Sequence, residues 1–260
     1  VNDVRGANIS VGLEGGIDID ATVGSDTANK SFDIEVFNVD DSTIALGTID
    51  IDMGRMSDDT DGLFNNTFGV TVTDADNSVV TVGEINANLD GAGFDLFVEY
   101  NENTNVTFSD VTATGEDASV RVADNLATTD GNDVLIEFGD VTLTGTSTDG
   151  DGVSVEIINN DDEFSAGLME VHVGDITMDS SDSALLLISG NDGETDRFDT
   201  PIVPVVGVQI DIGDVNIDLS SGSITDSVTA DLVTIENDGA HIVMGDVNVS
   251  MGNSDGSSYG

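Results

Sequence analysis

The sequence is poor in basic residues, and this shortage limits what the protein can bind. Only 5 Lys and Arg residues stand against 52 Asp and Glu residues, which gives a formal net charge of −47 at pH 7. Such a chain cannot form a basic patch, so nucleic acid and anionic membranes are not expected partners. Carboxylates at this density repel one another unless salt or divalent cations screen them, which indicates a saline or calcium-containing exterior.

Cysteine is absent, so the chain can form no disulfide and offers no thiolate ligand for a metal or an iron–sulfur cluster. No stretch of 18 apolar residues occurs, so no membrane-spanning helix is expected. Tryptophan is absent too, and the tyrosines are Tyr100 and Tyr259, which leaves few aromatic platforms for sugar rings. The sequence contains no nucleophile elbow, phosphate-binding loop or histidine metal motif, and it predicts no enzyme.

What the sequence does contain is an internal repeat built around a Gly-Asp pair, which we call the seam. The four clear copies begin at Gly139, Gly174, Gly213 and Gly245. Weaker copies bring the total to eight, and they begin at Gly15, Gly47, Gly83 and Ser109. Successive copies are separated by 26 residues (Gly83 to Ser109) to 39 residues (Gly174 to Gly213), with a mean of about 33.

Each seam lies between two segments with the alternation of β-strands. Around Gly139, apolar residues occupy positions −3, −1, +2 and +4, namely Ile136, Phe138, Val141 and Leu143. Period-two alternation is typical of a strand with one buried face. Gly139 and Asp140 both fall on the outward side, so the seam predicts a bulge or corner between two strands, with a hairpin turn as the alternative. Glycine suits such a point because it tolerates backbone angles that other residues resist.

A third apolar segment completes each period. Clear examples are Phe68–Val72, Phe94–Val98 and Val153–Ile157. Three short strands in about 33 residues suit one coil of a β-solenoid, whose coils stack at the strand spacing of ~4.8 Å. We therefore predict an all-β fold, a β-solenoid of about eight coils with three short strands each. A β-sandwich or a closed barrel is the alternative, because the period is uneven.

The repeats run through the whole chain, so we expect a single repeat-built β domain over residues 1–260. The largest interruption is an insertion at 189–206, which holds both prolines, Pro201 and Pro204. Proline cannot donate to a strand ladder, so this segment is expected at an edge or in an extended arm. Residues 252–260 are polar and are expected to form a flexible tail. The chain begins with Val instead of Met, which we interpret as removal of a signal peptide from an exported protein.

Two acidic loops are candidate calcium sites. Asp58, Asp59 and Asp61 precede Gly62, and Asp149 and Asp151 precede Gly152. Calcium takes six to eight oxygen ligands, and loops of this kind supply some of them. Neither loop completes the twelve-residue calcium motif with its terminal Glu, so solvated loops are the alternative. Calcium is the cofactor that the sequence suggests, and we predict no catalytic or further cofactor-binding residue.

Outward positions of the repeats carry polar side chains that should stack in columns. One column would hold the seam acids, Glu84, Asp110, Asp140, Asp175, Asp214 and Asp246. Because like charges at ~5 Å repel, these carboxylates should accept backbone hydrogen bonds, bind cations or point outward. A second column would hold Asn86, Thr112, Thr142, Thr177, Asn216 and Asn248. It suggests side-chain ladders, or an ice-binding face that Asp179 and Asp218 interrupt. His172 and His241 fall on outward positions as well, and we expect them to be surface residues.

This Asp-, Gly- and Thr-rich repeat style resembles acidic β-solenoid-like surface proteins of bacteria, including secreted filament and fimbrial subunits. The resemblance covers the whole chain and implies a structural role without catalysis. Open strands at the ends of a solenoid invite another subunit to continue the sheets, and head-to-tail contacts that do not close a ring produce a fibre. We therefore predict a self-assembling subunit of an extracellular filament or cell-surface coat, with divalent cations as further partners.

Two other classes of function stay open. A calcium-dependent adhesin or an ice-binding module would bind a saturable ligand without polymerising. A polysaccharide-active solenoid enzyme would turn over a neutral or acidic polysaccharide.

Overall fold

Strands from successive repeats stack into three parallel sheets. The computed structural model describes residues 1–12, 17–23, 31–55, 67–128, 134–146, 152–162, 168–193, 207–219, 229–235, 237 and 240–251.

Sheet A contains, in chain order, β1 (Asn2–Arg5), β4 (Ser31–Asp40), β7 (Thr67–Asp76), β10 (Gly93–Glu99), β13 (Ala118–Ala123), β17 (Val153–Ile158), β21 (Ser183–Ser189) and β25 (Thr229–Ile235). Sheet B contains β2 (Asn8–Val11), β5 (Thr43–Leu46), β8 (Val79–Val82), β11 (Asn105–Phe108), β15 (Val134–Phe138), β19 (Met169–Val173), β23 (Val208–Ile212) and β26 (Ala240–Met244). Sheet C contains β3 (Ile17–Val23), β6 (Ile49–Arg55), β9 (Ile85–Leu89), β12 (Val111–Gly115), β16 (Val141–Gly145), β20 (Ile176–Ser180), β24 (Val215–Leu219) and β27 (Val247–Met251). A small fourth sheet contains β14 (Leu126–Ala127), β18 (Asp161–Asp162) and β22 (Asp192–Gly193).

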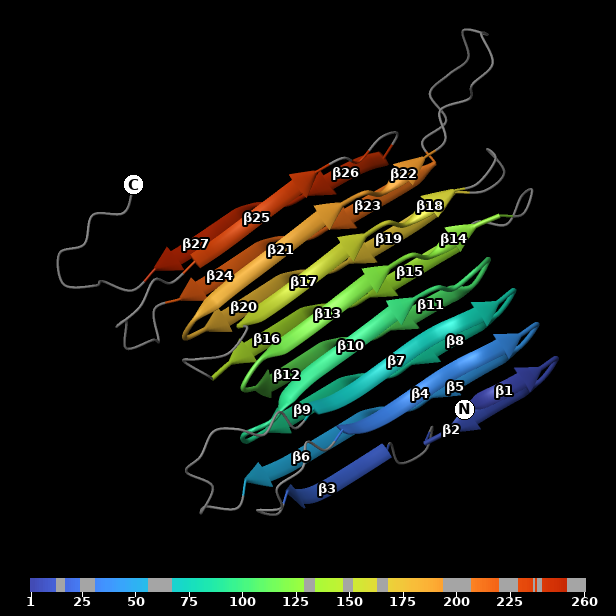
Figure 1. Cartoon of the computed structure of the whole chain (residues 1–260), viewed down its shortest axis with the longest axis horizontal. Helices are drawn as coiled ribbons and strands as arrows, with labels where there is room; N and C mark the ends of the chain where they lie inside the picture. The colour runs from blue at the N-terminus through green and yellow to red at the C-terminus, as the bar shows by residue number, and fades with distance from the viewer. Residues whose placement is uncertain are drawn as a thin grey trace, which may run out of the picture.

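The chain visits sheets A, B and C in turn and then begins again one strand further along the stack. The strands β4, β5 and β6 lie in the three sheets, and β7, β8 and β9 pair with them in the same order (Figure 1). Every strand pair in these sheets is parallel. A β-sandwich pairs its strands antiparallel, so the pairing is that of a solenoid-like parallel β fold. The described residues form no α-helix, and the predicted all-β class is confirmed.

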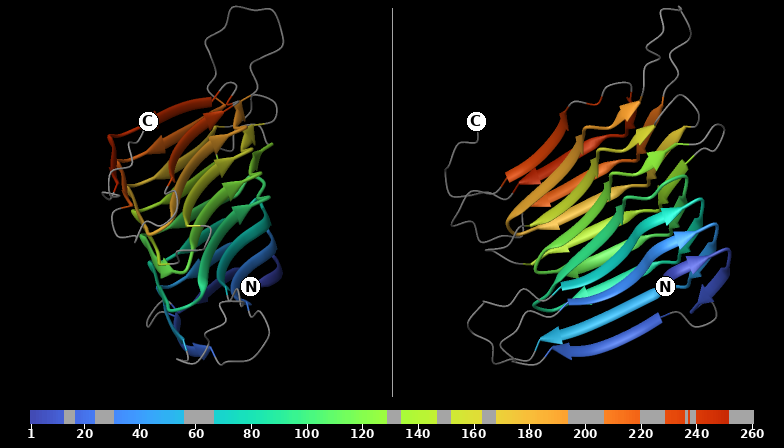
Figure 2. Two further views of the ribbon diagram at one scale, coloured as in Figure 1. Left: turned by 60° about the vertical axis from the view of Figure 1, so that its left-hand side comes forward. Right: turned by 45° about the vertical axis from the view of Figure 1, so that its right-hand side comes forward.

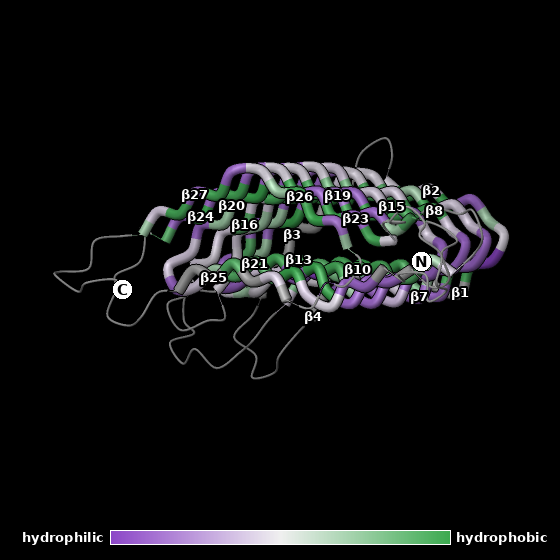
Figure 3. Tube along the Cα trace, turned by 90° about the horizontal axis from the view of Figure 1, so that it is seen from above, coloured by the Kyte–Doolittle hydropathy of each residue, from purple (hydrophilic) through white to green (hydrophobic). Residues whose placement is uncertain are grey.

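The seam marks the passage from sheet B to sheet C. The strand β15 ends at Phe138 and β16 begins at Val141, on either side of Gly139 and Asp140. Because the two strands belong to different sheets, the predicted bulge or corner between two strands is confirmed and the hairpin alternative is wrong. Sheets B and C together form one layer, and sheet A forms the layer opposite (Figure 3).

Apolar side chains from the two layers fill the interior. The alternation predicted around the seam is confirmed, since the buried residues of β15 and β16 include Val134, Ile136, Phe138, Val141 and Leu143. Stacking places like side chains on one another. The rings of Phe108 and Phe138 are nearly parallel, with centroids 4.9 Å apart. Seen along the stack, hydrophobic residues line the space between the layers (Figure 3).

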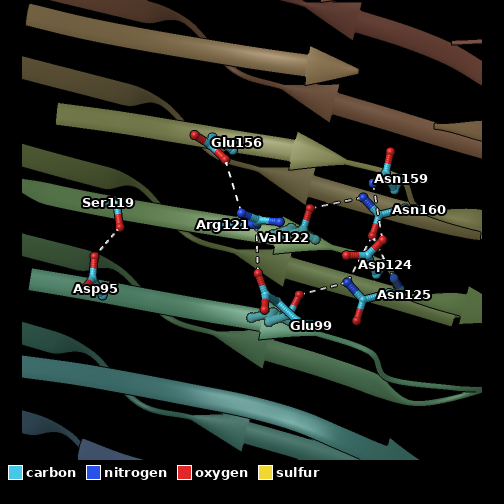
Figure 4. A network of polar contacts seen from close by, with 11 residues as sticks. Asp95, Glu99, Ser119, Arg121, Val122, Asp124, Asn125, Glu156, Asn159 and Asn160 are labelled. Atoms are coloured by element: carbon cyan, nitrogen blue, oxygen red, sulfur yellow. Dashed lines mark hydrogen bonds and ion pairs between the residues drawn. The ribbon is translucent and has the colours of Figure 1, made fainter. Parts of the chain in front are cut away.

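A ladder of asparagines runs along the turn that follows sheet A. Its members are Asn101, Asn125, Asn160, Asn191 and Asn237. The Nδ2 of each of the first four donates to the Oδ1 of the asparagine in the next repeat at 2.9 Å. The same Oδ1 accepts the backbone N–H of the preceding asparagine at 3.0–3.3 Å. Each Nδ2 also donates to a backbone carbonyl of the preceding repeat, as from Asn160 to Val122 at 3.2 Å (Figure 4).

The ladder pairs polar atoms that lie inside the fold, because its first four members are almost fully buried. A buried amide without partners costs about 1–3 kcal/mol, whereas here each asparagine supplies donors and an acceptor to its neighbours. The residue before each of these four has positive φ, namely Tyr100, Asp124, Asn159 and Gly190. In the two preceding repeats the ladder position holds Val39 and Ala75, and the N–H of Ala75 donates to Asn101 at 3.1 Å.

A shorter ladder of hydroxyl groups accompanies it in the N-terminal repeats. The N–H of Ser42 donates to Ser78 Oγ at 3.1 Å, and that of Ser78 donates to Thr104 Oγ1 at 3.2 Å. Each hydroxyl donates in turn to a backbone carbonyl two residues earlier in the chain. Side chains therefore complete the backbone hydrogen bonding of the turns where the sheets do not reach.

The predicted insertion and tail are only partly visible. Of the insertion at 189–206, the structure describes Ser189–Gly193, which includes the end of β21 and the whole of β22. Residues 194–206 and the predicted tail at 252–260 lie outside the described residues.

Replacing Asn160 with Ala should destabilise the protein by about 2–4 kcal/mol, because donors of Asn125 and the carbonyl of Val122 lose their partner in the interior. The control Asn248→Ala removes an exposed amide that donates to Asn216, and it should cost under about 0.5 kcal/mol. Urea unfolding followed by circular dichroism measures both. Equal losses in the two variants would contradict a structural role for the ladder.

Candidate functional site

The candidate calcium loops lie in parts of the chain that the structure does not describe. Asp58, Asp59 and Asp61 fall within residues 56–66, and Asp149 and Asp151 fall within 147–151. Calcium binding by these five residues therefore stays a prediction. Over the described ranges, no group of three or more His, Cys, Asp or Glu side chains is placed to hold a metal ion.

The seam carboxylates form a hydrogen-bonded series along the outside of the fold. The backbone N–H of Asp140 donates to Asp110 Oδ1, and that of Asp175 donates to Asp140 Oδ1, both at 3.0 Å. Asp214 and Asp246 continue the series with bonds of 2.9 Å to the preceding carboxylate. Of the three predicted outcomes for the column, acceptance of backbone hydrogen bonds is confirmed for Asp110, Asp140, Asp175 and Asp214. Each N–H bond to a charged oxygen offsets part of the repulsion along the column.

The seam glycine leaves room for that carboxylate. A Cβ added to Gly174 would lie 2.6 Å from Asp140 Oδ1 and 2.8 Å from the carbonyl oxygen of Gly139. A Cβ on Gly213 or Gly245 would meet the preceding aspartate in the same way. None of these seam glycines has positive φ. The expectation that glycine serves an unusual backbone angle is therefore wrong, and close approach between repeats is the reason for it.

The outward face of sheet C carries the predicted column of Asn and Thr. The register stacks Asn86, Thr112, Thr142, Thr177, Asn216 and Asn248. A second column stands two residues along each strand and contains Asn88, Thr114, Thr144, Asp179 and Asp218. Asn86 donates to Asp50 at 3.0 Å, and Asn88 donates to Asp52 at 3.3 Å. A shallow hollow of about 390 Å³ lies over these acids, the two asparagines, Thr112 and Thr114. Amides and hydroxyls thus form the middle of this face, with carboxylates on both sides.

Arg121 lies in the middle of the outward face of sheet A, between glutamates from the two neighbouring strands. Its Nε lies 2.7 Å from Glu99 Oε1, and its Nη1 lies 3.9 Å from Glu156 Oε2 (Figure 4). Burial raises the pKa of Glu99, Arg121 lowers it, and the acids Asp124 and Glu156 raise it again. One guanidinium therefore bridges carboxylates from the repeats before and after it.

A hollow of about 230 Å³ beside Arg121 is lined in part by Asp95, Ser119 and Ser154. Ser119 Oγ donates to Asp95 Oδ1 at 2.5 Å (Figure 4). Burial raises the pKa of Asp95, the bond from Ser119 lowers it, and Asp33 raises it. The described lining contains no His, Cys or Lys.

A column of acids follows the turn after sheet A, next to the asparagine ladder. Asp40 pairs in register with Asp76, and Asp76 pairs with Glu102. Burial raises the pKa of Asp76, and the carboxylates of Glu102 and Asp40 raise it further. A hydrogen bond from the backbone of Asn77 acts in the opposite direction, and Asp41 adds a smaller increase.

The two histidines lie on outward positions of sheet B, as predicted. His172 Nε2 lies 3.5 Å from Asp211 Oδ2 and 3.9 Å from Glu170 Oε1. His241 is exposed in β26. Protonated His172 can therefore offset the charge of neighbouring acids, and we assign neither histidine to catalysis.

The C-terminal end of the stack leaves inward side chains uncovered. In β27, Val247, Val249 and Met251 are 40, 47 and 42 % exposed. The residues that pair with them in β24, Val215, Ile217 and Leu219, are 0, 3 and 0 % exposed. At the opposite end of the stack (Figure 2), Val4, Ile9 and Ile17 are partly buried against the core.

The asparagine ladder is the feature that sequence patterns missed. Its members are separated by 24, 35, 31 and 46 residues, so no fixed period marks them. A local signal exists in the strands β10, β13, β17 and β21 of sheet A. In each of them, the last inward-facing apolar residue stands three positions before an asparagine. These pairs are Val98 and Asn101, Val122 and Asn125, Ile157 and Asn160, and Ile188 and Asn191.

Replacing Gly174 with Ala should destabilise the protein by about 1–3 kcal/mol, because the new Cβ overlaps both Asp140 Oδ1 and the Gly139 carbonyl. In an Asp140→Ala background the same change should cost less, since one of the two contacts is gone. Urea unfolding of the four proteins of this double-mutant cycle gives the coupling energy. Additive losses would show that the carboxylate does not set the need for glycine.

Replacing Asp76 with Asn should raise the melting temperature at pH 7 and have little effect near pH 3. The folded protein holds the proton of Asp76 more tightly than the unfolded chain, whose pKa is about 3.8. The protonated Asp76 carboxyl therefore contributes to the free energy of unfolding at low pH, and this contribution is lost as the pH rises through the raised pKa of Asp76. Thermal melts at both pH values measure this difference. The control Asp74→Asn changes an exposed acid of the same strand, and an equal gain there would contradict the assignment.

No protein-family model, curated protein or solved structure matches this chain. Among the described residues, no helix is both long enough and apolar enough to cross a membrane. The function is therefore inferred from the protein's own faces and edges.

Proposed function

We propose that the protein is a structural subunit of an extracellular filament or cell-surface coat, in which copies stack head to tail. The observation that supports this is the uncovered C-terminal end, where the inward-facing Val247, Val249 and Met251 are 40 to 47 % exposed. In this proposal the three sheets form a rod of eight coils with three short strands each, about 40 Å long at ~4.8 Å per coil.

Both ends of the rod offer strand edges to another subunit. The strands β25, β26 and β27 are the last members of sheets A, B and C, and β1, β2 and β3 are the first. An edge strand presents backbone N–H and C=O groups that another chain can pair with. Because all strands are parallel, the first strands of one copy run in the direction required to follow the last strands of another. Contact between two different ends propagates into a fibre when it does not close into a ring.

The charge of the protein fits growth along one axis. A net charge of −47 keeps neighbouring rods apart sideways. Divalent cations would screen or bridge the carboxylates, so we propose calcium as an accessory ion, with the loops of Asp58 and Asp149 as candidate positions. We propose a location outside the cell, where salt or calcium supplies this screening. The proposal includes no catalytic role.

The outward face of sheet C favours a second candidate function, an adhesin or ice-binding module. Thr112 and Thr114 pair in register with Thr142 and Thr144. Such an array repeats hydroxyls at ~4.8 Å between strands and offers an ordered surface to an ordered ligand. Asp179 adjoins Thr144 in the same column and limits the uncharged area. This candidate expects a protein that binds its ligand without polymerising.

Replacing Val249 with Asp should block end-to-end growth, because docking would bury a carboxylate without a partner. Asn248→Asp adds the same charge to the outward side of the same strand and should leave growth nearly unchanged. We expect Val249→Asp to raise the critical concentration for assembly at least about tenfold. Sedimentation and electron microscopy, each with calcium and with a chelator, measure this.

Filaments that form only with calcium would support a role for the acidic loops. Dispersed wild-type particles at high concentration in both conditions would contradict the filament proposal. Saturable binding by those particles, seen as thermal hysteresis or retention on a glycan, would then favour the second candidate.

A further inference from the structure

The hollow beside Arg121 lies on the outward face of sheet A, in the middle of the stack. It has a volume of about 230 Å³. Two register columns form it, and each column contributes one residue from β10, β13 and β17. The first column contains Asp95, Ser119 and Ser154, and the second contains Phe97, Arg121 and Glu156.

The shape of the hollow comes from short side chains that stand beside long ones. Ser154 is small, whereas Glu156, two residues further along β17, is long. Gly152 also borders the hollow and adds no side chain to it. Its φ is +77°, and a Cβ there would lie 2.2 Å from the carbonyl oxygen of Ser183, so the position requires glycine. The space over the column of serines is therefore left open.

Hydrogen-bond donors and acceptors both face this space. The carboxylate of Asp95 accepts one bond, from Ser119 Oγ at 2.5 Å (Figure 4), and its other lone pairs can accept from a ligand. The guanidinium of Arg121 has five N–H donors, more than its two contacts with glutamates use. Ser154 adds a hydroxyl that can donate or accept.

The charges around the hollow disfavour ionic ligands of either sign. Asp95, Asp117 and Glu156 line it and repel an anion, while the guanidinium of Arg121 repels a metal ion or an organic cation. A neutral ligand avoids both penalties. Neighbouring hydroxyl groups can donate to the carboxylates and accept from the guanidinium, and a sugar carries such hydroxyls around its ring.

Phe97 adds apolar surface to these polar groups. It pairs in register with Arg121 and is partly exposed on the outward face of β10. An aromatic side chain next to a few polar groups is the combination by which pockets hold and orient a ligand. The volume of about 230 Å³ is below the ~300–1,000 Å³ of pockets for drug-sized molecules, so the hollow has room for one ring.

We infer that the hollow beside Arg121 binds one ring of a neutral glycan. Asp95 and Glu156 accept hydrogen bonds from its hydroxyl groups, Arg121 and Ser154 donate to them, and Phe97 contacts its apolar face. The site goes beyond the proposed filament and does not depend on it, because one chain supplies every residue. It also lies on the opposite layer from the face of sheet C that favours the second candidate function.

Titration of the full chain with methyl glucoside, methyl mannoside and methyl galactoside, followed by ligand-observed NMR, tests this site. At least one glycoside should bind with a Kd of about 1–10 mM, as expected for a single ring. Asp95→Asn should raise this Kd at least about tenfold, because it removes a charged acceptor. The control Asp33→Asn makes the same change in the same register column of β4, outside the hollow, and should alter the Kd less than about twofold.

Replacing Ser154 with Leu should abolish binding, because the leucine side chain fills the hollow. The fold should tolerate this change, since Leu185 already occupies the same register position in β21. The control Thr81→Leu alters an exposed outward position of sheet B and should leave the Kd unchanged. Urea unfolding followed by circular dichroism shows whether each variant is folded.

No binding of any of the three glycosides at about 100 mM would overturn the site. Equal weakening by Asp95→Asn and Asp33→Asn, or unchanged binding to folded Ser154→Leu, would overturn the assignment to this hollow. Tighter binding of glucuronate or of glycine betaine than of the glycosides would overturn the neutral class of ligand. If Ser154→Leu does not fold, the pair Asp95→Asn and Asp33→Asn decides the assignment. Filament growth is measured separately, so each of these results leaves the filament proposal standing.

Discussion

Parallel pairing stacks each residue of a repeat on the residue at the same position in the next repeat, about 4.8 Å away. Residues of the same kind therefore lie next to one another along the stack. This suits apolar side chains, as the rings of Phe108 and Phe138 show. It suits amides even better, because an amide both donates and accepts, and Asn125 and Asn160 use both capacities inside the fold. It does not suit carboxylates, which accept but do not donate at neutral pH.

Because the chain is so acidic, repulsion between stacked carboxylates is the main unfavourable interaction of this fold. Two kinds of contact offset it. At the seam, Asp140 and its relatives accept a backbone N–H from the next repeat, and glycine leaves space for the carboxylate. On sheet A, Arg121 separates Glu99 from Glu156. Where neither device is present, as at Asp76, burial and neighbouring acids raise the pKa. In the first repeat, Arg5 lies 2.9 Å from Asp40 and offsets the charge of that acid in the same way.

The sequence predicted which positions of the strands are buried, but it did not predict the contacts that stacked turns make with one another. Alternation around Gly139 predicted buried positions, a corner and a column of acids, because a period of two follows directly from strand geometry. The reason for glycine was not predictable, since the contact between Gly174 and Asp140 joins two repeats. The asparagine ladder was missed because asparagine is common in polar turns and the spacing of Asn101 and its relatives varies with loop length. The calcium loops of Asp58 and Asp149 lie outside the described residues, so their role is still a sequence-based prediction.

X-ray fibre diffraction from aligned filaments tests the proposal that the sheets continue from one subunit to the next. Continuous sheets should give a reflection at about 4.8 Å on the meridian, because the strands of every subunit would repeat along the filament axis. A reflection at this spacing on the equator would contradict end-to-end stacking, since the rods would then associate side by side and their ends would play no part.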